Sequence, residues 1–294
     1  MNWVRFIVST SVEASESIAN YFFEIDAIGV ELKESTSKTT SIIAYFPLDE
    51  RVNTRVENLR KFISLLPSWG IDSQSTKIDL ENVESEDWEQ AWKSSYSPQR
   101  IGDQLYIVPS WHDVSGNQND IVIKIDPGMA FGTGYHPTTR LSLRLIEKTI
   151  KPNSIVADIG TGSGILSIAS IKLGASRVDA IEIDPSAIPV AEENFSINNV
   201  SSQVHLYERD GLGIIDGVYD LIVGNMLTKS ILPLIPQCIS RCNPDGSLIF
   251  SGILSTELDL IQKTLYENGF ECKQILEEME GGVVWLGILA GFLS

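Results

Sequence analysis

Residues 158–164, DIGTGSG, form a glycine-rich turn between an apolar run and the start of a helical pattern. Glycines at such a turn let the backbone approach a ligand closely, and the first N–H groups of the helix point toward that ligand. In the dinucleotide fingerprint the third glycine follows the second by three places, but here that place is Ile165 and the third glycine is Gly164. The turn therefore predicts a nucleoside-like ligand and argues against a nicotinamide dinucleotide.

Three polar residues follow successive apolar runs beyond this turn. Glu182 lies 22 positions after Gly160, where a carboxylate can accept hydrogen bonds from both ribose hydroxyls of a nucleoside. Asp210 could accept from the adenine amino group or could be an ordinary loop aspartate, and both interpretations stay open. Asn225 follows the run 221–223, at the edge where open α/β sheets bind ligands. Its amide oxygen can accept a hydrogen bond from an incoming amine, so we expect it to face the reacting group.

The stretch 126–139, DPGMAFGTGYHPTT, is rich in glycine and proline and shows no periodicity. These features predict a loop that covers the ligand, with Phe131 excluding water. We expect Thr138 or Thr139 to cap a helix beginning near Arg140 and to direct its positive end at a carboxylate. No histidine has a second histidine or cysteine at metal-ligand spacing, so no metal site is expected.

The chain must position these residues with two different patterns of elements. Residues 1–80 follow the order β-α-β-β-α-β, which predicts a small ferredoxin-like α+β domain. An acidic segment over 81–100 predicts a linker helix. Residues 101–294 alternate buried apolar runs with helical patterns, which indicates a Rossmann-like, doubly wound α/β domain. Its expected helices include one over 231–239.

Composition limits the class of protein further. At 43% hydrophobic and 21% charged residues, the 294-residue chain is an ordinary globular protein, long enough for two domains. Its formal charge of −17 repels a phosphate backbone and attracts a basic partner, so direct nucleic-acid binding is not expected. Three cysteines without a CxxC pair indicate a reducing compartment, and no apolar stretch is long enough for a membrane anchor. We therefore expect a cytoplasmic protein, and a monomer.

The glycine turn resembles the first motif of Rossmann-like methyltransferases that use S-adenosylmethionine. Together, several segments resemble the family that methylates large-subunit ribosomal protein eleven: 87–93 (DWEQAWK), 126–139, 158–164, 182–185 (EIDP) and 224–227 (GNML). The loop with FGTG and HPTT is the most specific of them. The sequence departs from the family pattern at Glu182, where aspartate is usual, and at Thr161, where cysteine is common.

The resemblance implies an N-terminal module that recognises the ribosomal protein and a C-terminal catalytic domain that binds S-adenosylmethionine. It assigns cofactor contacts to Thr139, Gly160, Glu182 and Asn225. From its position at a strand end and its amide chemistry, we expect Asn225 to be the catalytic residue as well. We expect the rest of the cofactor site to comprise Phe131, Thr133, Gly134, Asp158, Gly162 and Asp210.

The expected reaction is methyl transfer to amino groups of the ribosomal protein, at lysine side chains and an N-terminal amine. A lysine must lose its proton before it attacks, and the sequence offers no obvious strong base. Desolvation beside a cationic sulfonium would lower the pKa of the amine, leaving Asn225 to orient it. Two alternatives stay open: a small-molecule methyltransferase whose first 80 residues serve dimerisation, and a cofactor-sensing module without turnover. A nicotinamide oxidoreductase is the least favoured.

Overall fold

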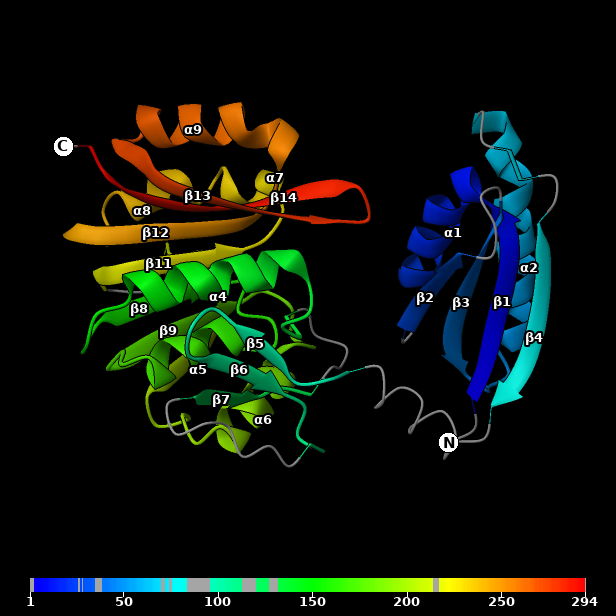
Figure 1. The fold of residues 1–294 in the computed structure, drawn as a ribbon, viewed down its shortest axis with the longest axis horizontal. Helices are drawn as coiled ribbons and strands as arrows, with labels where there is room; N and C mark the ends of the chain where they lie inside the picture. Colours follow the sequence, from blue (N-terminus) through cyan, green and yellow to red (C-terminus); the bar gives the residue numbers. More distant parts are fainter. Residues whose placement is uncertain are drawn as a thin grey trace. The chain divides into compact units, whose positions relative to one another are not determined.

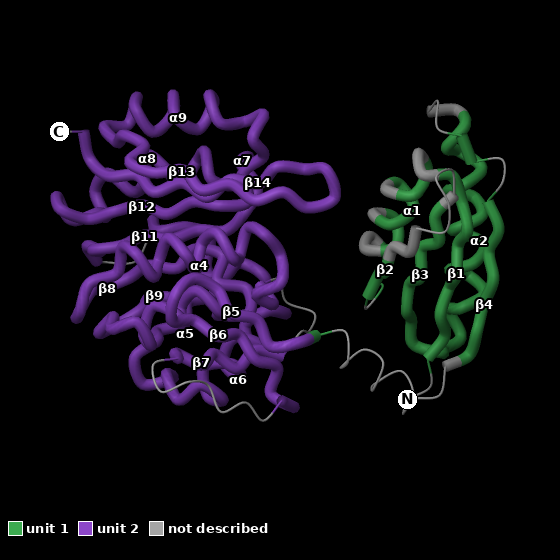
Figure 2. The backbone as a smooth tube through the Cα atoms, viewed as in Figure 1, with its two compact units in different colours: residues 1–96 green, residues 97–294 purple. Residues whose placement is uncertain are grey.

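The computed structural model describes residues 3–25, 27, 29–34, 39–69, 72–73, 76–83, 96–112, 120–126, 132–213 and 217–293. The chain forms two compact units, residues 1–96 and 97–294 (Figure 2). Most of the expected linker helix, residues 84–95, lies outside the described residues and stays a prediction. The ends of the range 81–100 belong to strands instead, because β4 extends to Val83 and β5 begins at Gln99.

The first unit is a four-stranded antiparallel sheet with the strand order β2-β3-β1-β4. This order and the sequence of elements confirm the expected ferredoxin-like fold. The alternating burial of β1 follows the pleat of a strand with one covered face. In chain order the elements are β1 (Trp3–Ser11), α1 (Val12–Glu24), β2 (Gly29–Glu34), β3 (Thr39–Pro47), α2 (Val52–Leu65), the 3₁₀ turn η1 (Leu66–Trp69) and β4 (Lys77–Val83).

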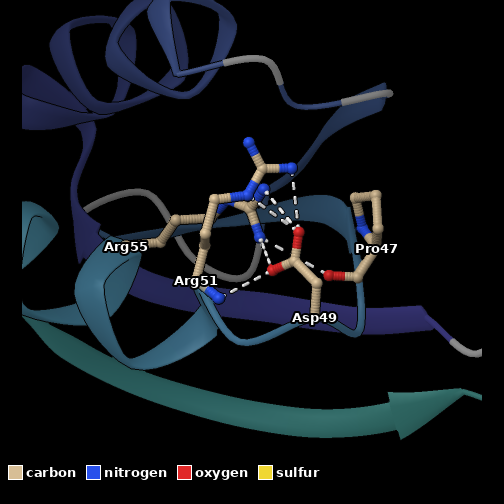
Figure 3. Close-up of polar contacts among 4 residues, drawn as sticks. All are labelled: Pro47, Asp49, Arg51 and Arg55. Atoms are coloured by element: carbon tan, nitrogen blue, oxygen red, sulfur yellow. Dashed lines mark hydrogen bonds and ion pairs between the residues drawn. The ribbon is translucent and has the colours of Figure 1, made fainter.

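The turn from β3 into α2 is built on the carboxylate of Asp49 (Figure 3). One oxygen accepts from the Arg51 backbone N–H at 2.9 Å and from Nη1 of Arg55 at 2.8 Å. The Arg55 guanidinium also lies 5.0 Å from the ring centroid of Phe46, which belongs to the core of this unit. Asp49 therefore stabilises the chain entering α2 from two positions before the N-cap, which is Arg51 itself.

The second unit contains a seven-stranded sheet with the order β10-β9-β8-β11-β12-β14-β13 (Figure 1). Neighbouring strands pair in parallel along the part of the sheet formed by β10, β9, β8, β11 and β12. Strand β14 pairs antiparallel with both β12 and β13. The bounds are β8 (Ile155–Ile159), β9 (Arg177–Glu182), β10 (Val204–Glu208), β11 (Tyr219–Asn225), β12 (Cys242–Leu254), β13 (Phe270–Glu280) and β14 (Val283–Phe292). The strand order reverses between β8 and β11, which is where open α/β sheets bind ligands.

Helices pack against the sheet in two hydrophobic clusters. One cluster includes α4 (Pro137–Thr149), α5 (Ile165–Lys172) and α6 (Ile188–Ile197). The other includes α7 (Thr228–Ile231), α8 (Ile235–Cys238) and α9 (Leu258–Glu267), with the 3₁₀ turn η2 (Ser255–Glu257) before α9. A small sheet of β5 (Gln99–Ile101), β6 (Leu105–Val108) and β7 (Ile121–Lys124) contributes to the first cluster. The Rossmann-like, doubly wound fold is confirmed.

Two details of this unit differ from expectation. Of the helix expected over 231–239, only α8 is formed, and α7 ends at Ile231, because Pro233 and Pro236 have no N–H to donate to a continuous helix. The hairpin of β13 and β14 was not foreseen, since its first strand is mostly polar and half-exposed. None of the described helices is both long enough and apolar enough to cross a membrane.

Candidate functional site

A cavity of about 870 Å³ lies at the carboxyl ends of β8, β9 and β11. It includes residues from each of these strand ends and from the first turn of α4. The cavity wall includes the glycine turn and several polar or aromatic side chains: Gly160, Gly162, Glu182, Asp210, Asn225 and Trp285. Five of these six residues were expected at the site from the sequence, and Trp285 was not. The size suits a small-molecule ligand with several polar anchoring points.

The glycine turn connects β8 to α5 with backbone that residues other than glycine rarely adopt. Gly160 has φ +68°, and its N–H donates to the carbonyl of Ile181 at 2.8 Å. A Cβ at this position would come within 3.0 Å of the Met226 methyl group. The bare backbone therefore leaves room for a ligand between this turn and the segment after β11.

Glu182 ends β9 with its carboxylate turned back onto the backbone around it. Oε2 accepts from the Gly162 N–H at 2.8 Å, and Oε1 accepts from the N–H groups of Ile183 and Asp184 at 2.9 and 3.0 Å. The residue is 7% exposed. Three backbone donors thus fix the carboxylate in the cavity wall and use three of its roughly four lone-pair positions.

Asp158 was expected to bind the cofactor, but the structure places it behind the cavity wall. Its Oδ2 accepts from the hydroxyls of Thr161 and Ser167, each at 2.6 Å. The side chain is fully buried, and burial raises the pKa of Asp158 to about 6. Asp158 therefore holds the glycine turn against α5 instead of lining the cavity. Thr161 stands where cysteine is common in the family, and its hydroxyl donates one of these two hydrogen bonds.

Asn225 ends β11 and is one of the residues that line the cavity. Nδ2 donates to Oγ1 of Thr139 at 3.3 Å, while the Oδ1 atom is buried and has no hydrogen-bond partner among the described residues. A buried acceptor without a partner is costly, so its persistence points to a ligand donor. Thr139, expected as a cofactor contact, is itself fully buried, and the cavity wall is formed by Thr138 instead.

The first turn of α4 is capped differently from the expectation. The helix begins at Pro137, and the N-cap is His136, whose Nδ1 accepts from the Thr138 N–H at 3.3 Å. Neither Thr138 nor Thr139 is the cap. Burial lowers the pKa of His136, so the ring is neutral at pH 7. Nδ1 also lies 2.8 Å from the Thr138 hydroxyl, so Thr138 holds this ring nitrogen through both its backbone and its side chain.

The loop before α4 is attached to the glycine turn. The Ser163 hydroxyl donates to the carbonyl of Gly132 at 2.6 Å. A Cβ on Gly134 would come within 3.0 Å of Ile107 and 3.3 Å of Ile165, so this glycine packs against the core. Thr133 is half-buried, and among the described residues neither it nor Gly134 lines the cavity. Phe131 lies outside the described residues, so its expected role is untested.

The residues of the cavity wall that sequence reasoning missed include Met226, Gly252 and Trp285. Gly252 has φ +86° and sits at a bulge in the pairing of β12 with β14. A Cβ there would lie 2.3 Å from the carbonyl oxygen of Met226, so only glycine lets the segment after β11 pack this closely. An isolated glycine inside an apolar strand pattern, as in 248–254, was the available signal.

The fold and the site together define a Rossmann-like methyltransferase, in which a glycine turn, a strand-end acid and a strand-end asparagine surround the switch point. The profile of the ribosomal protein L11 methyltransferase (PrmA) family matches residues 2–288. The ribosomal protein L11 methyltransferase of Pediococcus pentosaceus is 37% identical over 99% of this chain and 98% of its own length. That of Bacillus cytotoxicus is 36% identical over 99% of both chains.

A solved structure agrees with these relatives. The ribosomal protein L11 methylase from Lactobacillus delbrueckii subsp. bulgaricus superposes with a TM-score of 0.62 at 40% identity, over 68% of this chain and all of that one. The chain belongs to the ribosomal protein L11 methyltransferase family.

Proposed function

We propose that the chain transfers methyl groups from S-adenosylmethionine to amino groups of ribosomal protein L11, at lysine side chains and an N-terminal amine. Membership of the family supports the substrate and the type of reaction. The observation that carries the chemistry is the place of Asn225 in the cavity wall, with an Oδ1 atom that has no hydrogen-bond partner among the described residues. An amine N–H is the donor that this acceptor lacks.

The residues of the cavity fit the proposed cofactor, which when bound would supply a methyl group on a positively charged sulfur. Glu182 keeps one lone-pair position on Oε2 for a ribose hydroxyl, because the other three accept from the backbone. The Gly160 turn lets the backbone approach the same ligand. Asp210 borders the cavity, and its role toward adenine stays a prediction.

The acceptor amine must lose a proton, and the described cavity wall holds one imidazole that could be considered for it. His136 does not suit this role, because Thr138 occupies its Nδ1 and burial lowers the pKa of the ring, which makes it a weaker base. We therefore propose that desolvation beside the sulfonium lowers the pKa of the amine and that water removes the proton. Asn225 then aligns the lone pair with the methyl group.

We propose that the first unit, residues 1–96, selects the basic ribosomal protein and that the second unit carries the reaction. The net charge of −17 favours a basic partner. Because ribosomal proteins are made and assembled in the cytoplasm, the proposal places the enzyme there. The monomeric state and the absence of nucleic-acid binding stay predictions.

The test is a mass spectrum of purified L11 after incubation with the full chain and S-adenosylmethionine. Successive methyl additions on lysines or the N-terminus are expected, and Asn225→Ala should lose most of the activity. Free lysine and small amines serve as competing acceptors. Methylation of small amines with none on L11 would favour the small-molecule methyltransferase, and cofactor binding without any transfer would favour a sensing module.

A further inference from the structure

Trp285 lies near the start of β14 and forms part of the cavity wall, but no step of the proposed reaction uses its side chain. Its ring contacts the His136 ring edge to face, with centroids 5.2 Å apart and an interplanar angle of 69°. On the strand it pairs with Leu254 on one side and Glu278 on the other. These neighbours fix the orientation of the indole beside the cavity.

The first turn of α4 places this indole near Asn225. His136 contacts Trp285, and Thr139, three residues further on, accepts from the amide of Asn225. Residues three apart on a helix have Cβ atoms about 5 to 6 Å apart. The indole and the amide therefore both contact the N-terminal end of α4.

The register of the sheet shows that the two residues belong to the same face. Asn225 pairs with Ser251, and Ser251 pairs with Gly287 on β14. Trp285 is two residues from Gly287 and so lies on the same face of its strand. That face carries α4, since a Cβ on Gly287 would come within 2.9 Å of Leu141. Trp285 therefore lies on the same face of the sheet as Asn225, beyond the carboxyl end of β11.

We propose that Trp285 forms the second wall of the acceptor-amine subsite and sets how many methyl groups one amine receives. The inference rests on the proposed function and deepens it. In each transfer a bond forms between nitrogen and the methyl carbon, the carbon–sulfur bond breaks, and the amine releases one proton. An amine therefore loses N–H groups as it gains methyl groups, and the hydrogen bond to Asn225 becomes unavailable.

An aromatic ring behaves in the opposite way toward the same series of amines. The indole face attracts a cation and contacts its N-methyl groups, and tryptophan is the best of the side chains for this interaction. Its contribution persists when the last N–H is lost. Asn225 accordingly serves the first transfer most, whereas Trp285 retains partly methylated amines for the second and third transfers.

The first experiment measures binding and does not depend on turnover. The full chain with ¹⁵N-labelled tryptophan, saturated with S-adenosylhomocysteine, is titrated with the Nα-acetylated forms of trimethyllysine amide, lysine amide or norleucine amide, of which only the last is neutral. The indole signal of Trp285 is identified by its absence in Trp285→Phe. We expect this signal to shift more with trimethyllysine amide than with norleucine amide. An unchanged signal would overturn the inference.

The second experiment follows the products on L11 by mass spectrometry. Trp285→Leu should slow the later transfers about 2- to 30-fold relative to the first, the range that corresponds to one cation–π contact. Trp285→Phe should restore part of the loss, and cofactor affinity should stay unchanged. Met279→Ala, on the same hairpin and 69% exposed, is the matched control.

The two experiments separate this inference from the proposed function. A wild-type distribution of products from Trp285→Leu would contradict the role of the ring. If the wild-type chain transfers nothing to L11 while the indole signal responds to trimethyllysine amide, the proposed substrate is wrong and the amine subsite stands.

Discussion

Replacing Glu182 with glutamine tests how the strand-end acid binds the cofactor. The sequence suggested two hydrogen bonds to the ribose, but three backbone N–H groups already occupy most of the carboxylate. One position on Oε2 remains for a ribose hydroxyl. A single hydrogen bond to a charged group contributes about 1.5 to 3 kcal/mol, so the dissociation constant should rise about 10- to 150-fold.

The same substitution also turns an amide N–H₂ group toward backbone donors that previously met a carboxylate. At least one of those three N–H groups would lose its acceptor, at about 1 to 3 kcal/mol of folding free energy. We therefore expect Glu182→Gln to lower both cofactor affinity and the midpoint of urea unfolding. Calorimetry with S-adenosylhomocysteine measures the first effect, and unfolding without ligand measures the second.

Glu192→Gln is the matched control, because Glu192 is exposed on α6 and the change removes the same charge. It should leave both quantities close to those of the wild type. If folded Glu182→Gln bound S-adenosylhomocysteine as tightly as the wild type, Glu182 would have no contact with the ribose and the assignment would fail.

Three further predictions concern the surroundings of the site. Gly252→Ala places a Cβ 2.3 Å from the Met226 carbonyl and must displace the segment after Asn225, so steady-state kinetics should show kcat falling at least tenfold; an unchanged kcat would contradict this. Asp158 has a folded pKa of about 6, above its ordinary 3.8, so the stability from its bound proton is present below about pH 4 and lost as the pH rises toward 6. Asp158→Asn should therefore be more stable than the wild type at pH 7, by at most about 3 kcal/mol, and equal to it near pH 4 in urea unfolding; equal destabilisation at both pH values would refute the reasoning. If the charge of −17 steers association with L11, the association rate measured by stopped flow should fall as the salt concentration rises. A rate that does not change with salt would mean that the acidic residues serve only solubility.

The sequence predicted the fold where short-range patterns determine it. The alternation in β1 and the buried runs of β8, β9 and β11 carry the period or the length of a strand in the residues themselves. The β13–β14 hairpin was missed for a physical reason. Its first strand lies at the edge of the sheet with half its side chains exposed, so it has no buried run to detect.

The residues of the site were likewise predicted where a local pattern determines their position and missed where it does not. Gly160, Glu182 and Asn225 were found because each follows a strand whose end the chain must bring to the switch point. Asp158 and Thr139 were placed at the cavity although both are buried behind it, since spacing along the chain does not tell which side of a turn a side chain takes. Trp285 reaches the cavity only through antiparallel pairing with β12, a contact that no local pattern announces.

The first turn of α4 explains how these separate segments act as one site. His136 contacts the hairpin through Trp285, and Thr139 holds the amide of Asn225. The loop just before the helix is joined to the glycine turn by the bond from Ser163 to Gly132. The same helix is anchored in the core by Leu143, Leu145 and Ile146, all fully buried. The helix is fixed in the core on one side, and on the other its first turn contacts Trp285 and Asn225, which limits how far the hydrogen-bond acceptor and the aromatic wall can move apart. That restraint is what a positioning mechanism without a strong base requires, because alignment of the amine has to supply what proton abstraction does not.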